Sequence, residues 1–292
     1  MSDFVQQNSS VCKFDNSDSW VILSPIEQSI KSKIEAVGTP LKDWDISINY
    51  GIKTGYNDAF IISKETRNEI LAACKTADEN KRTEELIRPI LRGRDIKRYG
   101  YEWAELYLIA TFPSKHYDIE KYPAVKKYLL TFGMERLEQT GKKYIIRGEQ
   151  ITARKKTNNK WFETQDSISY WDEFNKPKIV WGNLNLSATY SFAPKGMMIN
   201  APATMIVSAS ESLLCILNSK LADYYIRNLG VTRNGGYFEY KPMFIEQLPV
   251  PNTISDALFT KYKESQNENE INKLVYNIYN LTEEEIDFVE NS

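Results

Sequence analysis

Apolar residues recur at helical spacing close to the start of the chain. In SPIEQSIKSKIEAVG, isoleucines and a valine three or four positions apart form one apolar face. Ser24 can cap this helix, Pro25 suits its first position, and Glu27 completes a capping box. We expect Gly38 to end the helix in the left-handed conformation. The pattern therefore predicts a capped helix whose apolar face packs on a core.

Further helical patterns follow along the chain. Charged residues predict one helix over residues 64–88, and YPAVKKYLLTFGMERLEQ predicts another with a lysine-bearing face. SASESLLCILNSKLADYYIRNLG is the strongest pattern, because Ser208 and Glu211 fit a capping box, leucines line one face, and Gly230 can end the helix. We interpret this segment as a core helix.

Strands are predicted where aromatic and β-branched residues concentrate. ISINYGI and AFIIS are expected to pair with each other around the glycine-containing loop between them. Further strands are expected at residues 106–112, 178–183, 197–200 and 204–208. This alternation of strands and helices predicts a mixed α/β fold of the α+β kind.

The character of the chain changes near residue 251. The prolines of LPVP interrupt regular structure, and an acidic stretch rich in Asn and Glu follows them. Within it, INKLVYNIYNL has helical spacing, and TEEE can cap a last short helix at Thr282. We predict one domain over residues 20–252 and a peripheral, acidic helical tail over residues 253–292.

Composition indicates a globular protein of a reducing compartment. Of the 292 residues, 42% are hydrophobic, which is enough for a sizeable core. No apolar run reaches the roughly 18 residues of a membrane helix, and the polar, acidic first segment does not resemble an export signal. The three cysteines are far apart and outside any CxxC pair, so we expect neither disulfides nor structural zinc, and a cytoplasmic location.

Charge is distributed unevenly along the chain. The net charge is only −2, but residues 51–160 hold 23 lysines and arginines against 15 acidic residues, whereas residues 251–292 hold 3 against 9. A positively charged middle is typical of a surface that faces a nucleic-acid groove, and it is equally typical of a solvated, lysine-rich face. Charge alone does not separate these two interpretations.

Catalytic motifs are missing from the sequence. No two prolines are adjacent, which excludes the Asp/Asn-Pro-Pro-aromatic motif with which amino-group DNA methyltransferases hold a flipped base. No GxG or GxxxxGK occurs, so the common glycine-rich loops for S-adenosylmethionine, dinucleotides or triphosphates are absent. His116 is the single histidine and is expected at the surface, so a cryptic enzyme would need chemistry around it that the sequence does not display.

Five blocks, taken in order, carry a resemblance to a known family. They are GIKTGYNDAF (51–60), IRPILRGRDIKRY (87–99), YPAVKKYLL (122–130), LLCILNSKLADYYI (213–226) with GGYFEYKPMFIEQLPVP (235–251), and INKLVYNIYNLTEEEI (271–286). Together they resemble the TaqI-like C-terminal specificity domain of adenine-specific DNA methyltransferases, including fused type IIG restriction-modification enzymes. The resemblance also implies kinship with the recognition domains of type I specificity subunits, which are mixed α/β globules attached to helical spacers.

The resemblance implies a function for the whole chain. In that family this domain reads the target sequence in double-stranded DNA, while a separate catalytic part binds S-adenosylmethionine and, in enzymes that also cut, magnesium. The chain itself would then hold no cofactor and would work with a methyltransferase or endonuclease domain of the same or a partner chain. Two alternatives remain: a protein-protein interaction module, and a stand-alone specificity subunit that recruits a separate methyltransferase.

The segment LRGRDIKRY is one candidate for contacting DNA. Arg92, Arg94, Lys97 and Arg98 surround Asp95, and forked guanidinium groups can hold phosphates or a guanine edge. An internal Arg-Asp pair, for which we consider Arg94, would instead brace the loop. Both interpretations stay open.

The segment ARKKTNNKWFE is the stronger candidate. Its cations can contact phosphates, its two asparagines can hydrogen-bond base edges, and it has no apolar periodicity. The alternative is a mobile surface loop, and we favour DNA recognition because variable loops are where a reading domain changes its target. The predicted contacts are Arg154, Lys155, Lys156, Asn158, Asn159 and Lys160.

Two glycine-containing turns complete the predicted interface. In GIKTGYNDAF the glycines form the turn, while Lys53, Thr54 and Asn57 offer a cation, a hydroxyl and an amide to DNA. In TRNGGYFEY a hairpin-like turn is expected, with DNA contacts by Arg233 and Asn234 as an addition to that structural role.

Overall fold

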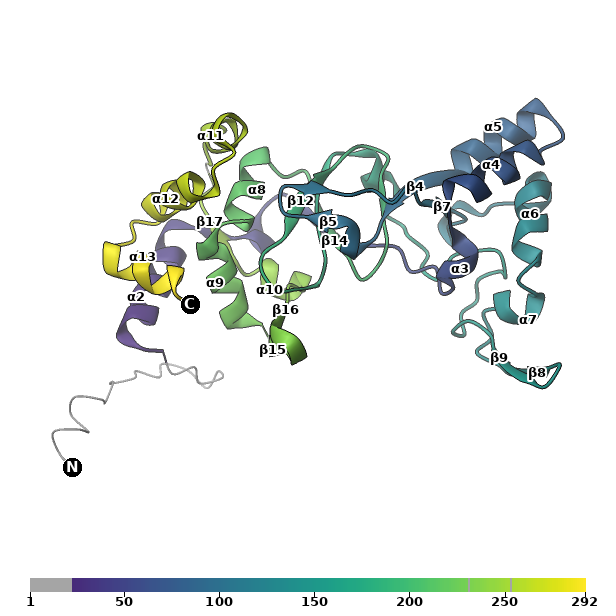
Figure 1. The fold of residues 1–292 in the computed structure, drawn as a ribbon, viewed down its shortest axis with the longest axis horizontal. Coiled ribbons are helices and arrows are strands. Elements are labelled where there is room, and N and C mark those ends of the chain that lie inside the picture. Colours follow the sequence, from purple (N-terminus) through teal and green to yellow (C-terminus); the bar gives the residue numbers. More distant parts are fainter. Residues whose placement is uncertain (1–22, 231, 253) are drawn as a thin grey trace. The chain divides into compact units, whose positions relative to one another are not determined.

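The computed structural model describes residues 23–230, 232–252 and 254–292, and these residues form two compact units (Figure 1). Unit 2 comprises residues 46–185 and 189–209, and unit 1 comprises the other described residues.

One sheet of unit 2 consists of four antiparallel strands. Its strand order is β12-β10-β14-β2, and in this sheet Trp181 pairs with Tyr190 on one side and with Thr204 on the other. Every residue of β10 and β14 is buried, which explains why both strands are apolar apart from Lys178 and Thr204. The strands are β2 (Ser47–Tyr50), β10 (Lys178–Trp181), β12 (Tyr190–Ala193) and β14 (Thr204–Val207).

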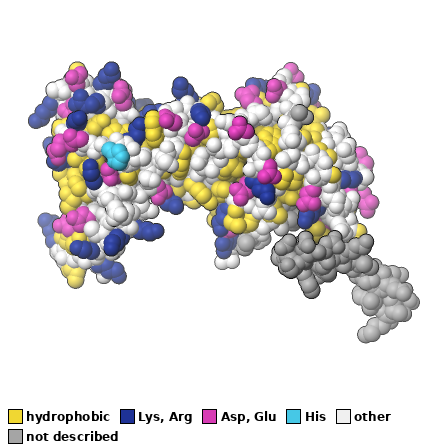
Figure 2. All heavy atoms as spheres, turned by 180° about the vertical axis from the view of Figure 1, so that it is seen from behind, with side chains coloured by type: hydrophobic (Ala, Val, Ile, Leu, Met, Phe, Trp, Pro, Cys, Tyr) yellow, Lys and Arg dark blue, Asp and Glu magenta, His cyan; other side chains and the backbone are white. Residues whose placement is uncertain are grey.

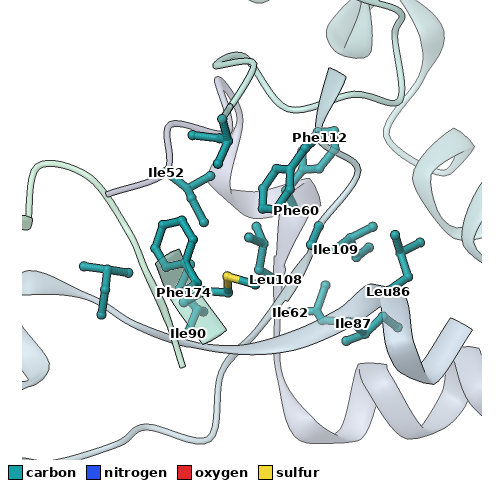
Figure 3. Close-up of a cluster of buried hydrophobic side chains, with 14 of the residues drawn as sticks. Ile52, Phe60, Ile62, Leu86, Ile87, Ile90, Leu108, Ile109, Phe112 and Phe174 are labelled. Atoms are coloured by element: carbon teal, nitrogen blue, oxygen red, sulfur yellow. The ribbon is translucent and has the colours of Figure 1, made fainter. Parts of the chain in front are cut away.

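A second sheet of unit 2 packs against a large apolar cluster. Its order is β13-β4-β7-β3, with β13 parallel to β4 and the other pairs antiparallel. Figure 3 shows that Phe60, Leu108 and Phe174 of this cluster come from widely separated parts of the sequence. The strands are β3 (Ile61–Ile62), β4 (Ile87–Leu91), β7 (Tyr107–Ile109) and β13 (Met198–Ile199).

Short helices, two small two-stranded sheets and one further short strand complete unit 2. The helix predicted over residues 64–88 is interrupted, and a glycine with φ of +82°, Gly133, separates the two helices that form in place of the one predicted after residue 122. The helices are α3 (Asn57–Phe60), α4 (Lys64–Ala72), α5 (Ala77–Leu86), α6 (Pro123–Leu130) and α7 (Met134–Leu137); the remaining strands are β5 (Ile96–Lys97), β6 (Gly100–Tyr101), β8 (Lys143–Ile146), β9 (Glu149–Thr152) and β11 (Leu184–Asn185).

The predicted pairing of the two strands around the first glycine loop is wrong. β2 pairs with β14, and β3 pairs with β7 in the other sheet. The chain leaves β2 at Gly51, where a Cβ atom would lie 2.7 Å from the main-chain carbon of Asn200, and Ile52 then forms a bridge to Asn200. The intervening turn and α3 carry the chain to the second sheet, so the two strands end up with different partners.

Unit 1 is mainly helical. Ser24 caps α2 with the predicted capping box, but Gly38 has φ of −107° and is extended rather than left-handed. The absence of a side chain at Gly38 is required because a Cβ atom would lie 2.3 Å from the main-chain carbon of Pro249. The elements are α2 (Pro25–Val37), β1 (Thr39–Pro40), α8 (Glu211–Leu217), α9 (Lys220–Leu229), β15 (Thr232–Arg233), β16 (Tyr237–Glu239), α10 (Pro242–Ile245), β17 (Pro249–Val250), α11 (Ala257–Ser265), α12 (Glu268–Ile278) and α13 (Glu283–Glu290).

The predicted long core helix is two helices, α8 and α9. Ser210, not Ser208, caps α8, since Ser208 has φ of +66° and lies before the helix. Ser219 caps α9 by accepting a hydrogen bond from the main-chain nitrogen of Ala222. Both helices bury most of their apolar residues, so the predicted core role is confirmed. The prediction of one continuous helix is wrong.

The helices after residue 252 belong to unit 1 rather than to a separate tail. Glu285 in α13 accepts hydrogen bonds from Ser29 at 2.6 Å and Lys33 at 2.7 Å in α2, and Tyr279 donates to the carbonyl oxygen of Pro249. Burial alone would raise the pKa of Glu285, but these hydrogen bonds lower it to about 2. The unit boundaries therefore differ from the predicted division at residue 252. None of the helices in the described residues is long and apolar enough to cross a membrane.

Candidate nucleic-acid interface

Arg154 is buried at the centre of the predicted DNA-contacting loop. Only 4% of the residue is exposed, and its guanidinium group donates hydrogen bonds at 2.5–2.9 Å to the carbonyl oxygens of Thr54, Leu137, Trp161 and Glu163. Burial lowers the pKa of Arg154 to about 10, which leaves it charged at neutral pH. The predicted contact between Arg154 and DNA is therefore corrected, since all its hydrogen bonds are directed into the protein.

Two further amides brace the same loop. The buried side chain of Gln139 donates to the carbonyl oxygens of Lys160 and Glu163 and accepts from the hydroxyl of Thr157. Asn159 donates its side-chain N–H groups to the carbonyl oxygens of Thr164, at 3.2 Å, and Gln165, at 2.8 Å. Asn159 therefore braces the loop, in contrast to its predicted role in reading bases. Only its side-chain oxygen, Oδ1, remains to accept a hydrogen bond from DNA.

The loop after β2 is joined to this assembly. Thr54 is 1% exposed, donates to Oδ1 of Asn57 at 2.7 Å and accepts from the main chain of Tyr56, so its predicted DNA contact is also corrected. The carbonyl oxygen of Lys53 accepts a hydrogen bond from the main chain of Gln165. The side chains of Lys53 and Asn57 remain exposed. The residues near position 54 and those near position 160 therefore form one braced surface.

The exposed members of this surface are mostly positively charged. They are Lys53, Asn57, Lys155, Lys156, Asn158 and Lys160, and we call them the basic surface. Figure 2 shows Lys and Arg side chains gathered at the end of unit 2 that carries α7 and the β8–β9 hairpin in Figure 1. The geometry presents cations together with exposed amides, the combination needed to hold phosphates and to meet base edges.

The segment after β4 is arranged differently from its prediction. Arg92, not Arg94, is the brace, since its guanidinium group forms a two-pronged pair with Asp95 at 2.7–3.2 Å. Burial would raise the pKa of Asp95, but hydrogen bonds from Arg92 outweigh it and lower that pKa. Arg94 is exposed, and Arg98 lies against the ring of Tyr99.

The predicted turn in unit 1 is confirmed as a hairpin. β15 and β16 are antiparallel, and Gly235 and Gly236, both with positive φ, form the turn with Asn234. Arg233 pairs with Glu239, which also pairs with Lys241 at 2.7 Å, so the charge of Arg233 is offset within the hairpin. Asn234 is exposed.

The sequence analysis missed the hairpin of β8 and β9. Its strands, KYII and EQIT, carry the aromatic and β-branched residues of a strand, and two residues, Arg147 and Gly148, connect them. Arg-Gly is not among the usual two-residue hairpin turns, which is why the signal was weak. The hairpin ends at Thr152, three positions before Lys155 of the basic surface.

The described residues contain one histidine and no cluster of metal-binding side chains. His116 is exposed and lies just after Pro113–Lys115 with φ of +50°. Within the part of the chain that the structure describes, no three His, Cys, Asp or Glu side chains are grouped so that they could hold a metal ion.

Solved restriction-modification enzymes share this fold. The chain is similar to the type IIL restriction-modification enzyme MmeI, solved in complex with DNA, at 13% identity and a TM-score of 0.53, covering 87% of this chain and 36% of that one. It is also similar to the type IIG restriction endonuclease BpuSI at 14% identity and a TM-score of 0.51, covering 89% of this chain and 32% of that one. The chain thus spans about a third of these enzymes, and no curated protein matches it significantly.

The fold is therefore that of a portion of restriction-modification enzymes. The family model of the TaqI-like C-terminal specificity domain matches residues 88–250, which is more than half of the sequence. The chain belongs to this family of specificity domains.

Proposed function

We propose that the chain is the sequence-specific DNA-recognition part of an adenine-specific DNA methyltransferase of a restriction-modification system, similar to the type IIG enzymes. Its family supports this role, as does the observation that carries most weight: buried Arg154 holds two loops together so that their lysines and amides face outward. Cys74 and Cys215 are not in a disulfide, which agrees with the reducing, cytoplasmic setting of this proposal.

The exposed residues have two distinct proposed roles. Lys53, Lys155, Lys156 and Lys160 neutralise phosphates of double-stranded DNA, and Asn57 and Asn158 hydrogen-bond base edges. In this proposal Arg94 and Arg98 of unit 2 extend the contact to the backbone, and Asn234 of unit 1 makes a separate contact with DNA. Both classes are needed, since phosphate contacts give affinity and position while base contacts give sequence choice.

Catalysis is assigned to a partner part. A methyltransferase domain, in the same chain or in a separate one, supplies the S-adenosylmethionine site and flips the target adenine, and magnesium is needed there if the whole enzyme also cuts DNA. This chain transfers no methyl group by itself.

Salt dependence tests the DNA-binding half of the proposal. The affinity of the chain for a mixed-sequence duplex, measured by fluorescence anisotropy, should fall linearly on a log-log scale as salt rises, by roughly 0.9 in slope for each phosphate contact. A triple variant, Lys53→Ala, Lys155→Ala and Lys156→Ala, should flatten that slope. Affinity that does not depend on salt would contradict the proposal.

A labelling experiment tests the assignment of catalysis. The purified chain, incubated with labelled methyl donor, magnesium and mixed-sequence DNA, should give neither methylated nor cut product, and calorimetry should detect no binding of the donor. Methyl transfer that persists through repurification and is lost on mutation of this chain would show that it contains the catalytic centre.

A further inference from the structure

The β8–β9 hairpin presents an outward face that is unusual for a small ribbon. Ile145 is 82% exposed, more than any other large apolar side chain among the described residues. It pairs across the ribbon with exposed Gln150, and exposed Lys143 and Thr152 form the next pair on the same face. The opposite face carries Tyr144, Ile146 and Ile151, which are half-buried, together with Glu149. Within the described residues, no other part of the protein covers the face of the hairpin that carries Ile145 and Gln150.

The turn of the hairpin carries a residue that its geometry does not favour. Ile146 and Glu149 form the closing pair, so the turn consists of Arg147 and Gly148, with φ of +51° and +83°. Two positive φ angles define the type I′ turn, for which Asn-Gly is the preferred sequence. An arginine in the left-handed conformation is less favourable than asparagine, which visits that region far more readily. Arg147 therefore places a guanidinium group at the tip of the hairpin although arginine suits this turn poorly. Such a local mismatch between residue and backbone is typical of a functional position.

The base of the hairpin is held firmly. Arg136 in α7 donates to the carbonyl oxygen of Thr152 at 2.8 Å, and the hydroxyl of Tyr144 donates to Glu138 at 2.9 Å. The chain continues from Thr152 through Ala153 into Arg154, whose hydrogen bonds brace the basic surface. Figure 1 shows the hairpin extending beyond α7 with its turn at the free end. The tip therefore has a defined position relative to the basic surface.

The dimensions of the hairpin match the major groove of DNA. Each strand has four residues and rises about 3.4 Å per residue, so the ribbon reaches about 14 Å. The major groove is about 12 Å wide and about 8.5 Å deep and admits a two-stranded ribbon, whereas the minor groove is about 6 Å wide. Residues 141–160 hold seven lysines and arginines against one glutamate, and this charge favours DNA over a protein surface as the occupant.

We propose that the β8–β9 hairpin enters the major groove and reads the target sequence, with Arg147 contacting a guanine, Gln150 an adenine, and Ile145 a thymine methyl group. Arginine and glutamine are the side chains whose paired hydrogen-bonding groups match the edges of guanine and adenine, and an apolar side chain suits the thymine methyl. The inference rests on the proposed DNA-recognition function and adds a second base-reading element to Asn57 and Asn158.

Arg147→Asn separates reading from folding. Asn-Gly suits the turn better than Arg-Gly, so the variant should be at least as stable as the wild type in thermal unfolding, yet it lacks the guanidinium group. Selection from duplexes with a randomised central segment should give a motif for the wild-type chain and loss of preference at one or two adjacent pairs for the variant. Affinity for the wild-type motif should fall roughly 5- to 150-fold, the value of one good base contact.

Two further duplexes and two further variants complete the experiment. Replacing guanine in the motif by 7-deazaguanine removes the N7 acceptor in the major groove and should weaken the wild type but not Arg147→Asn, whereas inosine, which lacks the minor-groove amino group, should weaken neither. Gln150→Ala should lose preference at a different base pair. The control, Lys31→Gln, removes one charge from α2 in unit 1 and should select the wild-type motif unchanged.

The possible results separate a failure of the hairpin assignment from a failure of the proposed DNA-recognition function. Wild-type motif and affinity in both Arg147→Asn and Gln150→Ala would overturn the hairpin assignment alone, and so would wild-type binding that depends on salt but has no sequence preference. A wild-type chain that binds no duplex at low salt would overturn the proposed function, and the hairpin assignment with it.

Discussion

Two cation-rich segments of unit 2 satisfy a structural arginine in different ways. In residues 153–160 the buried cation, Arg154, donates all its hydrogen bonds to main-chain carbonyl oxygens. In residues 92–98 the corresponding structural cation, Arg92, is paired with the buried carboxylate of Asp95. Carbonyl groups satisfy the guanidinium group without cancelling its charge, whereas a carboxylate cancels it.

The difference indicates where attraction for phosphates is strongest. Around Arg154 the exposed lysines add to a buried positive charge, although the carboxylate of Glu163 lies near enough to raise the pKa of Arg154. The pair of Arg92 and Asp95 has no net charge, and Lys97 forms an ion pair with Glu102 at 3.6 Å. We therefore expect the first segment to dominate DNA binding, and the following predictions test that comparison.

The largest effect is expected from Arg154→Met. Four carbonyl groups in three separate segments would lose the hydrogen bonds from Arg154, and we expect the free energy of unfolding to fall by about 3 kcal/mol. Urea unfolding followed by tryptophan fluorescence measures this change. The exposed neighbour serves as control, because Lys155→Met should alter stability by less than about 0.5 kcal/mol. Equal unfolding midpoints for the two variants would refute the bracing role.

Arg92→Gln should destabilise by less, about 1–2 kcal/mol, because the Arg92 side chain is 24% exposed and its pair is partly screened. The pKa of Asp95 is lowered in the folded state, so the stability that the pair contributes is present above the ordinary value of about 3.8 and is lost as pH falls through the lowered value. The difference in the free energy of unfolding between the wild type and Arg92→Gln should therefore become smaller at acidic pH. Arg94→Gln is the control, and an equal loss from it would mean that the wrong arginine has been assigned as the brace.

The two adjacent asparagines should separate folding from reading. Asn159→Ala removes two hydrogen bonds to main-chain carbonyl oxygens and should cost about 1–2 kcal/mol in urea unfolding. Asn158→Ala, at an exposed position, should leave stability within about 0.5 kcal/mol and change which duplexes are selected from a randomised pool. Identical target choice for wild type and Asn158→Ala would move base recognition elsewhere.

Lys155→Ala should have the smallest effect on stability. It should also have the clearest effect on the salt dependence of DNA binding. It should leave unfolding unchanged, weaken all duplexes alike, and lower the slope of log affinity against log salt by about 1. Lys97→Ala should change the slope less, since Lys97 is near Glu102 and donates to the carbonyl oxygen of Arg94. A larger slope change for Lys97→Ala would reverse the comparison between the two segments.

Local features of the fold were predictable from the sequence. The capping boxes at Ser24 and Thr282 and the strands β7, β10, β13 and β14 formed as expected, because caps and strand propensity depend on neighbouring residues. Pairing was not predictable, since β2 and β3 found partners more than 40 positions away. Helix continuity failed where a serine in mid-pattern, Ser219, caps a new helix.

The interface was predictable as a region but not residue by residue. The cation-rich loop after position 153 was identified, yet nothing local distinguishes buried Arg154 from exposed Lys155. The distinction depends on carbonyl groups that folding brings together, one of them, that of Thr54, 100 positions away. The hairpin was missed because its turn sequence breaks the usual preference, which is also the observation that points to its function.

The chemical nature of the loop braces has an evolutionary consequence. Arg154, Gln139 and Asn159 donate mainly to main-chain carbonyl oxygens, which are present whatever side chain a position carries. Substitutions at the exposed positions between the braces can therefore accumulate without removing any of these hydrogen bonds. A lineage could drift from one DNA target to another by changing Asn158 or its exposed neighbours, while each intermediate keeps a folded loop.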